Sequence, residues 1–408
     1  MRRLLWTMGL IVPLGGLLFG YNTAVISSAL LFLKHDFSFT TLQQELLVSI
    51  ILIGALLGAS VAGMLSDRLG RKPVIILSDV FFIIGGLTLL LADDLFALLI
   101  GRLIAGVGVG LASVTVPLYL AELSPPKSRG ALVTLNQLAI TVGILLAYLV
   151  GLFESGDQSW RIMFGLSIIP AVIQLLGMFL LPETPNYLTV TKEPKSRNKA
   201  FFKKTMTGAL IVGLGLAILQ QITGINTVIY YANQIFELAG FGTNISAIWA
   251  SVGVGIVNVV ATLFSVWLLD RVGRRPLLLV GVAGMTLSLL ALATTFWLNI
   301  PSESYLSVIS LMLYVAAFAI GLGPVAWLII SEIYPHQIRG RAMSLAIFAN
   351  WVSNYIVSLT FLTLIEKITS AGAFFLYAAI CGFAFYFVFR FVPETKGKTL
   401  KQIEKDLN

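Results

Sequence analysis

The sequence has one cysteine, two histidines and few charged residues, and each scarcity excludes a class of protein. Because Cys381 has no second cysteine to pair with, an intramolecular disulfide is impossible. No cluster of metal ligands or activated nucleophile accompanies His35 and His336, so we expect neither an enzyme nor a bound metal or cofactor. Charged residues make up 11% of the chain, whereas soluble domains contain about 25%. The chain is therefore not expected to be an ordinary soluble protein.

Hydrophobic residues make up 58% of the chain and recur in long blocks. Each block has about 20 residues, the length that crosses a bilayer as a helix. A membrane β-barrel would instead show alternating segments of about ten residues, and the sequence contains none. The sequence predicts an all-α membrane protein with twelve transmembrane helices, at residues 8–32, 45–66, 73–92, 95–119, 130–152, 160–181, 208–237, 245–269, 276–298, 304–331, 341–364 and 371–391.

The net charge of +8 reflects topology rather than affinity for nucleic acid. Nearly all Lys and Arg residues fall on one side of the twelve-helix map, in the N-terminus, short loops, central linker and C-terminal tail. The exceptions are Lys34, Arg161 and Lys367 on the other side and Arg102 within a span. This bias predicts that both termini are cytoplasmic. The expected partner is the lipid bilayer, with no nucleic acid.

The first apolar block is expected to remain in the protein as helix 1. It is too long for the apolar region of a signal peptide, and no small-residue cleavage site follows it. We therefore expect a multi-pass plasma membrane protein. The short loops favour a bacterial inner membrane, and we expect the protein to function as a monomer.

The sequence repeats three landmarks at offsets between 203 and 211 residues. D-R-L-G-R-K-P begins at Asp67 and D-R-V-G-R-R-P at Asp270; Glu122 and Glu332 each precede an Arg-Gly pair by seven residues; P-E-T occurs at 182–184 and at 393–395. The repeat predicts two pseudo-symmetric six-helix bundles, the major facilitator fold, with the substrate between them. The expected bundles are residues 1–181 and 208–392, with a short basic cytoplasmic linker at 182–207 and a cytoplasmic tail at 393–408.

Motifs along the whole chain resemble those of the sugar porter family of the major facilitator superfamily, including facilitative glucose transporters and bacterial proton–xylose and proton–glucose symporters. Besides the repeated loops, they are G-R (101–102), P-L-Y-L-A-E (117–122), Q-Q-I-T-G-I-N (220–226), G-P-V-A-W (323–327), R-G-R (339–341) and P-E-T-K-G (393–397). The resemblance implies transport of a neutral monosaccharide, a hexose or pentose and foremost a glucose-like sugar, by alternating access. The linker departs from the family, whose members usually carry a longer, folded one.

Amides inside the predicted helices suit a sugar ligand. An amide inside a span is costly unless something bonds to it. A carboxamide is both donor and acceptor, as a sugar hydroxyl is, and a tryptophan ring can cover the apolar face of the sugar. The resemblance assigns sugar contact to Gln137, Gln220, Gln221, Asn226, Asn258, Trp327 and Asn350. The alternative is that such amides only hold helices together.

Two helices are expected to kink, at Gly224 and at Gly323-Pro324. Tyr230 and Tyr231 follow the first of these positions. The resemblance implies that they form an outer gate over the ligand, whereas an interfacial aromatic belt is the alternative.

Acidic and basic residues at the predicted cytoplasmic helix ends are expected to form a conformational switch. The resemblance implies that these sets pair when the transporter faces outward and separate as it turns inward. Their alternative role is to set topology and fix the loops. The residues are Asp67, Arg71, Glu122, Arg129 and Glu183 in the first half, and Asp270, Arg274, Arg275, Glu332, Arg339 and Glu394 in the second.

The predicted helix 1 carries Asn22 where proton-coupled relatives typically carry an aspartate facing an arginine matched by Arg102. An amide cannot take up and release a proton in the accessible pH range. Ser167 likewise stands where some symporters have glutamate. These residues predict a uniporter. Asp79, well inside a span, is expected to pair locally or to extend toward the basic side, and the alternative is that it carries a proton.

Other functions remain open at this stage. The nearest alternative is a proton-coupled sugar or polyol symporter that uses another carboxylate. A non-transporting sugar sensor would usually add long cytoplasmic extensions, and the predicted tail is short. A drug exporter would favour a more apolar cavity with a buried acid.

Overall fold

The computed structural model describes residues 2–124, 129–154, 159–184, 207–241, 244–300, 305–334, 339–398 and 402–403. Within these residues, eleven helices are long and apolar enough to cross a membrane. The last of them, α17 (Arg339–Phe391), leaves helical geometry at Ile368 and Thr369, where two helices meet at a kink. It therefore contains the two helices predicted at 341–364 and 371–391, and the twelve-helix prediction is confirmed.

The chain forms two compact units. The N-terminal unit consists of Met1–Pro194, Ile229–Gln234 and Thr243–Gly255, and the C-terminal unit of Lys195–Val228, Ile235–Gly242 and Ile256–Asn408. Short pieces of the predicted seventh and eighth helices thus group with the N-terminal unit. The domain boundaries inferred from the repeat remain predictions.

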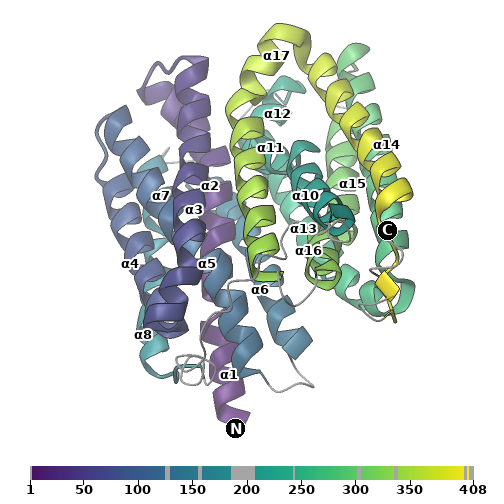
Figure 1. Ribbon diagram of the computed structural model, residues 1–408. Helices are drawn as coiled ribbons and strands as arrows, with labels where there is room; N and C mark the ends of the chain where they lie inside the picture. Colours follow the sequence, from purple (N-terminus) through teal and green to yellow (C-terminus); the bar gives the residue numbers. More distant parts are fainter. Residues whose placement is uncertain are drawn as a thin grey trace. The chain divides into compact units, whose positions relative to one another are not determined.

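The N-terminal unit is a helical bundle, drawn from purple to blue-green in Figure 1. Its strongest packing joins α3 to α5, α4 to α5 and α2 to α6. The helices are α1 (Arg2–Ile11), α2 (Leu14–Asp36), α3 (Thr41–Leu69), α4 (Arg71–Leu90), α5 (Leu95–Leu123), α6 (Arg129–Phe153), α7 (Trp160–Gly165) and α8 (Ile168–Phe179).

Glycines let α3 and α5 approach to backbone contact. Gly54 and Gly58 lie one turn apart in α3, and Gly106 and Gly110 lie one turn apart in α5. A methyl group on Gly54 would overlap the carbonyl oxygen of Leu103, and one on Gly106 would overlap that of Ile51. Small residues four apart on facing helices stabilise membrane bundles through close van der Waals packing.

The C-terminal unit contains most of the second set of helices, drawn from teal to yellow in Figure 1. Within it, α14 packs against α15 and α17, and α10 packs against α16 and α17. Besides α17, the helices are α10 (Thr207–Ile222), α11 (Ile225–Tyr230), α12 (Ala232–Leu238), α13 (Asn244–Val272), α14 (Arg274–Trp297), α15 (Leu306–Ile320) and α16 (Leu322–Ile333). The short pieces of α11, α12 and α13 named above belong to the N-terminal unit.

Both predicted kinks are real, but one lies at a different residue. The first break is at Gly224, whose φ of 94° favours glycine, and it separates α10 from α11. The second is at Gly321, between α15 and α16, rather than at Gly323-Pro324. Pro324 falls in the first turn of α16, where backbone N–H groups have no intrahelical partner. Its missing N–H therefore costs no helical hydrogen bond.

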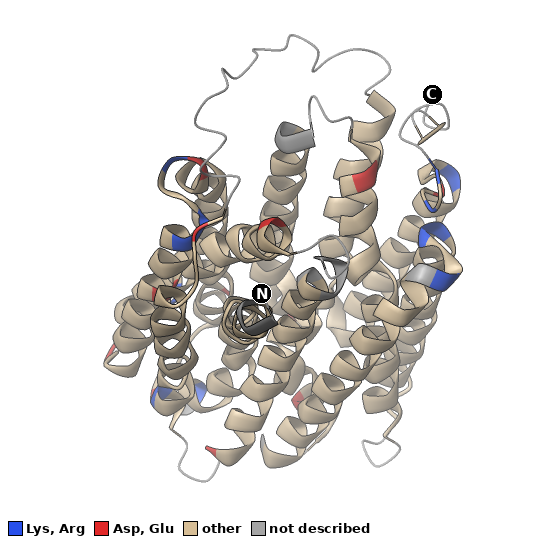
Figure 2. Ribbon diagram, turned by 90° about the horizontal axis from the view of Figure 1, so that it is seen from below, with Lys and Arg blue, Asp and Glu red and all other residues tan. Residues whose placement is uncertain are grey.

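Charged residues gather near helix ends in the described part of the chain, as Figure 2 shows. At the start of α4, the carboxylate of Glu183 accepts the backbone N–H groups of Arg71 (3.0 Å) and Lys72 (3.1 Å). The guanidinium of Arg71 lies 3.1 Å from Glu122 and 3.7 Å from Asp67. A carboxylate at a helix N-terminus satisfies unpaired N–H groups and complements the helix dipole.

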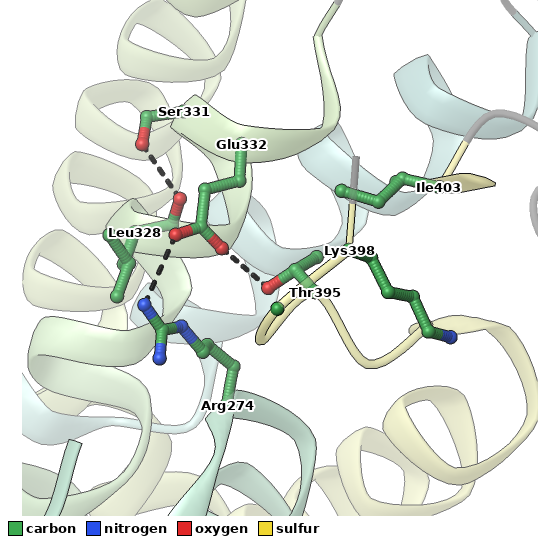
Figure 3. Close-up of a pocket in the computed structure, with 8 residues that line it drawn as sticks. Arg274, Leu328, Ser331, Glu332, Thr395, Lys398 and Ile403 are labelled. Atoms are coloured by element: carbon green, nitrogen blue, oxygen red, sulfur yellow. Dashed lines mark hydrogen bonds and ion pairs between the residues drawn. The ribbon is translucent and has the colours of Figure 1, made fainter. Parts of the chain in front are cut away.

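The same arrangement recurs at the start of α14, in the C-terminal unit. Glu394 accepts the backbone N–H groups of Arg274 (3.1 Å) and Arg275 (3.0 Å), and Arg274 pairs with Glu332 at 3.3 Å. Figure 3 shows Glu332 held between Arg274 and Thr395, whose hydroxyl donates to it. These residues line a cavity of about 470 Å³ that Lys398 and Ile403 also border.

The hydrogen bond from Thr395 to Glu332 has no counterpart among the described residues of the first cluster. Thr184 corresponds to Thr395 in the repeat, yet neither its hydroxyl nor Oε2 of Glu122 has a partner among the described residues. The sequence repeat therefore predicts the shared helix-end geometry but not this difference.

Substituting Gly54 with alanine should destabilise the N-terminal unit, because the new methyl group meets the carbonyl oxygen of Leu103. Overpacking of this kind costs about 1–3 kcal/mol. Gly63→Ala is the matched control in the same helix, since no atom lies within 4 Å of its added methyl. Thermal unfolding of the purified protein should give a lower melting temperature for G54A and an unchanged or higher one for G63A. Equal melting temperatures would contradict tight α3–α5 packing.

Substituting Glu394 with glutamine should destabilise the protein at neutral pH but not in acid. Burial raises the pKa of Glu394, but hydrogen bonds from the backbone N–H groups of Lys396, Arg274, Arg275 and Thr395 outweigh it and leave the pKa below its usual value. A depressed carboxylate pKa stabilises the folded state at pH values above the unfolded pKa, and that stabilisation is lost as the pH falls through the folded pKa.

Melting temperatures of wild type and E394Q, followed from neutral pH to below about pH 4, the ordinary range of a carboxyl group, measure this effect. The gap should close on acidification. A gap that is constant over the whole range would refute the assignment.

Candidate functional site

Four side-chain amides form a continuous hydrogen-bonded chain beside the break at Gly224, all within the C-terminal unit. Asn226 donates to Oε1 of Gln221 (2.6 Å), and Gln221 donates to Oδ1 of Asn350 (3.1 Å). Asn350 in turn donates to Oε1 of Gln220 (2.9 Å). The glutamine pair near the end of α10 is thus linked to α17 by side-chain hydrogen bonds.

Two residues of this amide chain also donate to backbone carbonyls of neighbouring helices. Gln220 donates to the carbonyls of Leu322 (3.0 Å) and Gly323 (3.2 Å), just after the break between α15 and α16. Asn350 also donates to the carbonyl of Ala217 (2.8 Å). The amide chain therefore ties together α10, α16 and α17, three helices of the same unit, with a fixed orientation of each amide.

The amide chain keeps capacity for a ligand. An amide has two N–H donors and an oxygen with two lone pairs, and the contacts above use only part of this set. Gln220, Gln221 and Asn350 are buried, whereas Asn226 is half-buried and lies nearest to open space. Such a group can exchange hydrogen bonds with neutral hydroxyls and offers no charge to an ionic substrate.

Two tyrosine hydroxyls donate hydrogen bonds to backbone carbonyls near the helix breaks. Tyr314 on α15 donates to the carbonyl of Thr223 at 2.9 Å, within the C-terminal unit. Tyr148 on α6 donates to the carbonyl of Ile229 at 2.8 Å, within the N-terminal unit. Neither tyrosine was predicted as a site residue, because a hydroxyl that reaches a distant carbonyl leaves no pattern in the sequence.

The other predicted sugar contacts lie outside the amide chain. Asn258 on α13 is buried and Trp327 on α16 is half-buried, both in the C-terminal unit. Gln137 is half-buried on α6 and belongs to the N-terminal unit. All three therefore remain predictions.

Tyr230 and Tyr231 are both buried, at the end of α11 and just after it. They group with the N-terminal unit, as does Asn233, another buried residue that the sequence analysis missed. Asn233 donates to Ser28 Oγ at 3.0 Å and accepts from Ser251 Oγ at 2.5 Å. The gate role of the tyrosines stays a prediction.

The structure describes most of the predicted switch residues at the two helix-end clusters. The side chains of Arg129, Asp270 and Arg339 lie outside the described residues. So does the basic linker from residue 185 to residue 206.

Arg102 is buried without a carboxylate partner among the described residues. Its guanidinium donates to three backbone carbonyls, those of Asn22 (2.6 Å), Val48 (3.2 Å) and Leu47 (3.3 Å). The side chain of Asn22 donates to the carbonyl of Leu18 (3.0 Å). Three carbonyl oxygens thus bind the Arg102 guanidinium. In proton-coupled relatives, the matching arginine is expected to face an aspartate.

Asp79 contradicts the expectation of a local pair or an extended side chain. It is 0% exposed, and neither carboxylate oxygen has a hydrogen-bond partner in the part of the chain that the structure describes. The expectation was wrong because it rested on depth along the helix, whereas burial depends on the direction in which the residue faces.

Known proteins match the chain along almost its full length. The family profile described as "Sugar (and other) transporter" matches residues 8–209 and 191–407. The glucose transporter GlcP of Staphylococcus epidermidis is 39% identical, with 97% of this chain and 95% of the relative covered. The galactose-proton symporter of Escherichia coli K12 is 35% identical, with 97% and 93% covered.

A solved structure has the same fold. The inward-open xylose transporter XylE from E. coli superposes with a TM-score of 0.86 at 32% identity, covering 98% of this chain and 99% of that one. The predicted fold class is therefore confirmed, and the expectation that the chain is not an enzyme agrees with transporter relatives. The chain belongs to the sugar porter family of the major facilitator superfamily.

Proposed function

We propose that the protein is a uniporter that moves a neutral, glucose-like monosaccharide down its gradient by alternating access. The observation that carries the sugar part is the amide chain of Asn226, Gln221, Asn350 and Gln220. It supplies donors and acceptors without charge beside a helix break, the kind of site that binds substrates in transporters of this type. GlcP, a relative with similar length, is a glucose transporter.

The observation that supports uniport is the environment of Arg102. In this chain a titratable group is missing from position 22, and three carbonyls satisfy the guanidinium. Protonation of a neighbouring carboxylate is therefore not needed to change the state of Arg102. The second candidate is proton symport, which the galactose-proton symporter among the relatives favours.

The helix-end clusters are proposed to act as the conformational switch. Each combines a buried or half-buried ion pair with a carboxylate at the start of a helix. Partly desolvated networks of this kind can shift a two-state equilibrium by a few kcal/mol. We propose that Tyr230 and Tyr231 close over the sugar, with Gln137, Asn258 and Trp327 as further contacts.

Substituting Gln221 with alanine should weaken sugar binding, because it removes the acceptor of Asn226 and the donor to Oδ1 of Asn350 from the amide chain. The loss of such a polar contact costs about 1–3 kcal/mol, or roughly tenfold in affinity for each 1.4 kcal/mol. Radiolabelled glucose binding and counterflow in proteoliposomes would measure it.

The matched control is Gln174→Ala. Gln174 is a buried glutamine of the N-terminal unit that donates to the carbonyl of Val12 (2.9 Å). Q174A should lower thermal stability and leave sugar affinity unchanged. Equal loss of affinity in both variants would assign the effect to packing, and failure of every monosaccharide tested on wild type would reject the sugar proposal.

Wild-type protein in proteoliposomes should equilibrate labelled sugar without accumulating it when a pH gradient is imposed. The reason is that Asn22 cannot carry a proton beside Arg102. Asn22→Asp is the informative variant, because it places a titratable carboxyl next to the guanidinium and should make net uptake pH-dependent. Accumulation above equilibrium by the wild type, driven by the gradient, would establish symport instead.

A further inference from the structure

Asp79 is a buried carboxyl group that neither the amide chain nor the helix-end clusters use. It lies in α4, two turns after Arg71, on the half of the helix nearer the predicted cytoplasmic end. Its exposed fraction is 0%, and both oxygens lack a hydrogen-bond partner among the described residues. An ionisable residue inside a membrane span is costly, and such residues commonly mark functional sites.

The position of Asp79 on α4 follows from its neighbours along the helix. Gly86 lies seven residues, or two turns, further on and so shares its face. A methyl group on Gly86 would contact Ile168 at 2.8 Å and Ser167 at 3.2 Å, at the start of α8. The preceding residue, Ser78, has its carbonyl oxygen toward Gly108 of α5. Asp79 therefore lies where α4 packs against α8 and α5.

The charged groups of the surrounding helices are engaged elsewhere. Arg71 pairs with Glu122 and Asp67, and Lys72 donates to the carbonyl of Leu181. In the other helices that pack on α4, Arg102 binds three carbonyls, Arg161 pairs with Asp93, and α8 carries no charged residue. Four charged residues of α2 and α3 remain in the described part of the chain. Lys34, Glu45 and Arg68 have interactions of their own, and Asp36 accepts a hydrogen bond from Trp160.

A carboxylate in this position would be a bare charge in an apolar interface. Removing a carboxylate from water without a compensating partner costs so much that such a group takes up a proton instead. The neutral acid loses only the hydrogen bonds of a polar group. The packing of α4 on α5 and α8, as the structure has it, is therefore compatible with the protonated form of Asp79.

We propose that Asp79 is a proton-binding site that makes the transport rate depend on pH without coupling a proton to the sugar. The neutral acid permits the packed conformation of α4. When the carboxyl releases its proton to water, α4 must separate from α5 and α8 or admit water. The transport cycle includes the packed conformation, so exchange slows as the pH rises. The predicted effect on the transport rate rests on the proposed transport function, whereas the proton-binding site itself does not.

The test is sugar exchange at equal pH inside and outside proteoliposomes, which removes any gradient. Above the pKa of a single group, the ratio of neutral to charged form falls about tenfold per pH unit, and the wild-type rate should fall by up to this factor. Asp79→Asn mimics the neutral acid and should exchange at every pH as wild type does at low pH. Asp93→Asn is the matched control, because Asp93 is exposed at the surface, and it should retain the wild-type profile.

Two results would overturn the proposal: a pH profile of D79N that matches wild type, or a wild-type rate that does not change with pH. Asp79→Leu, which is also neutral, provides a second variant if D79N does not fold. It should likewise remove the pH dependence.

Infrared difference spectroscopy tests the site without any sugar. The wild type should show a protonated-carboxyl band in neutral buffer that D79N and D79L lack and D93N keeps. If no sugar is exchanged by any variant but the band is assigned to Asp79, the transport proposal fails and the proton site stands. If the band survives in D79N, the proton site fails whatever the transport result.

Discussion

Backbone groups at the depth of the hydrocarbon must find hydrogen-bond partners inside the protein. Two helices of the candidate site are broken, so side chains must bind the backbone carbonyls that the breaks leave without helical partners. Tyr314 donates to the carbonyl of Thr223 beside one break, and Gln220 donates to two carbonyls beside the other. The two readings of intramembrane amides, helix packing and ligand binding, are therefore not exclusive here. Gln220 secures the broken backbone, whereas Asn226 and Gln221 keep donors and acceptors that no hydrogen bond among the described residues uses.

The helix-end clusters show how one solution is used twice with different detail. In each unit a glutamate from a distant segment caps the start of a helix, and a glycine with positive φ, Gly70 or Gly273, precedes that helix. The hydroxyl of the threonine after the capping glutamate donates to Glu332 in one unit, whereas in the other it has no partner within the described part of the chain. The two units thus share a frame while differing in how fully their ion pairs are satisfied.

The sequence allowed prediction of the spans and of the break at Gly224, because these depend on local composition and on backbone preferences. The four residues of the amide chain were named as sugar contacts from the family resemblance, which stays a prediction, and their hydrogen bonds to one another were not foreseen. The break at Gly321 was misplaced because proline is harmless in the first turn of a helix. Tyr148, Tyr314 and Asn233 were missed because their partners lie far along the chain. The prediction for the surroundings of Asp79 was wrong because hydropathy indicates depth in the membrane and not the direction in which a side chain points.

The capping of α4 by Glu183 has a consequence for biosynthesis. The acceptor lies 112 residues after the N–H group that it binds, so α4 enters the membrane with the start of the helix still uncapped. Its final partner is synthesised only after α8, and α14 waits 120 residues for Glu394 in the same way. The last residues of each half thus complete a helix that was inserted early, and a chain that stops short of either glutamate leaves that helix unfinished.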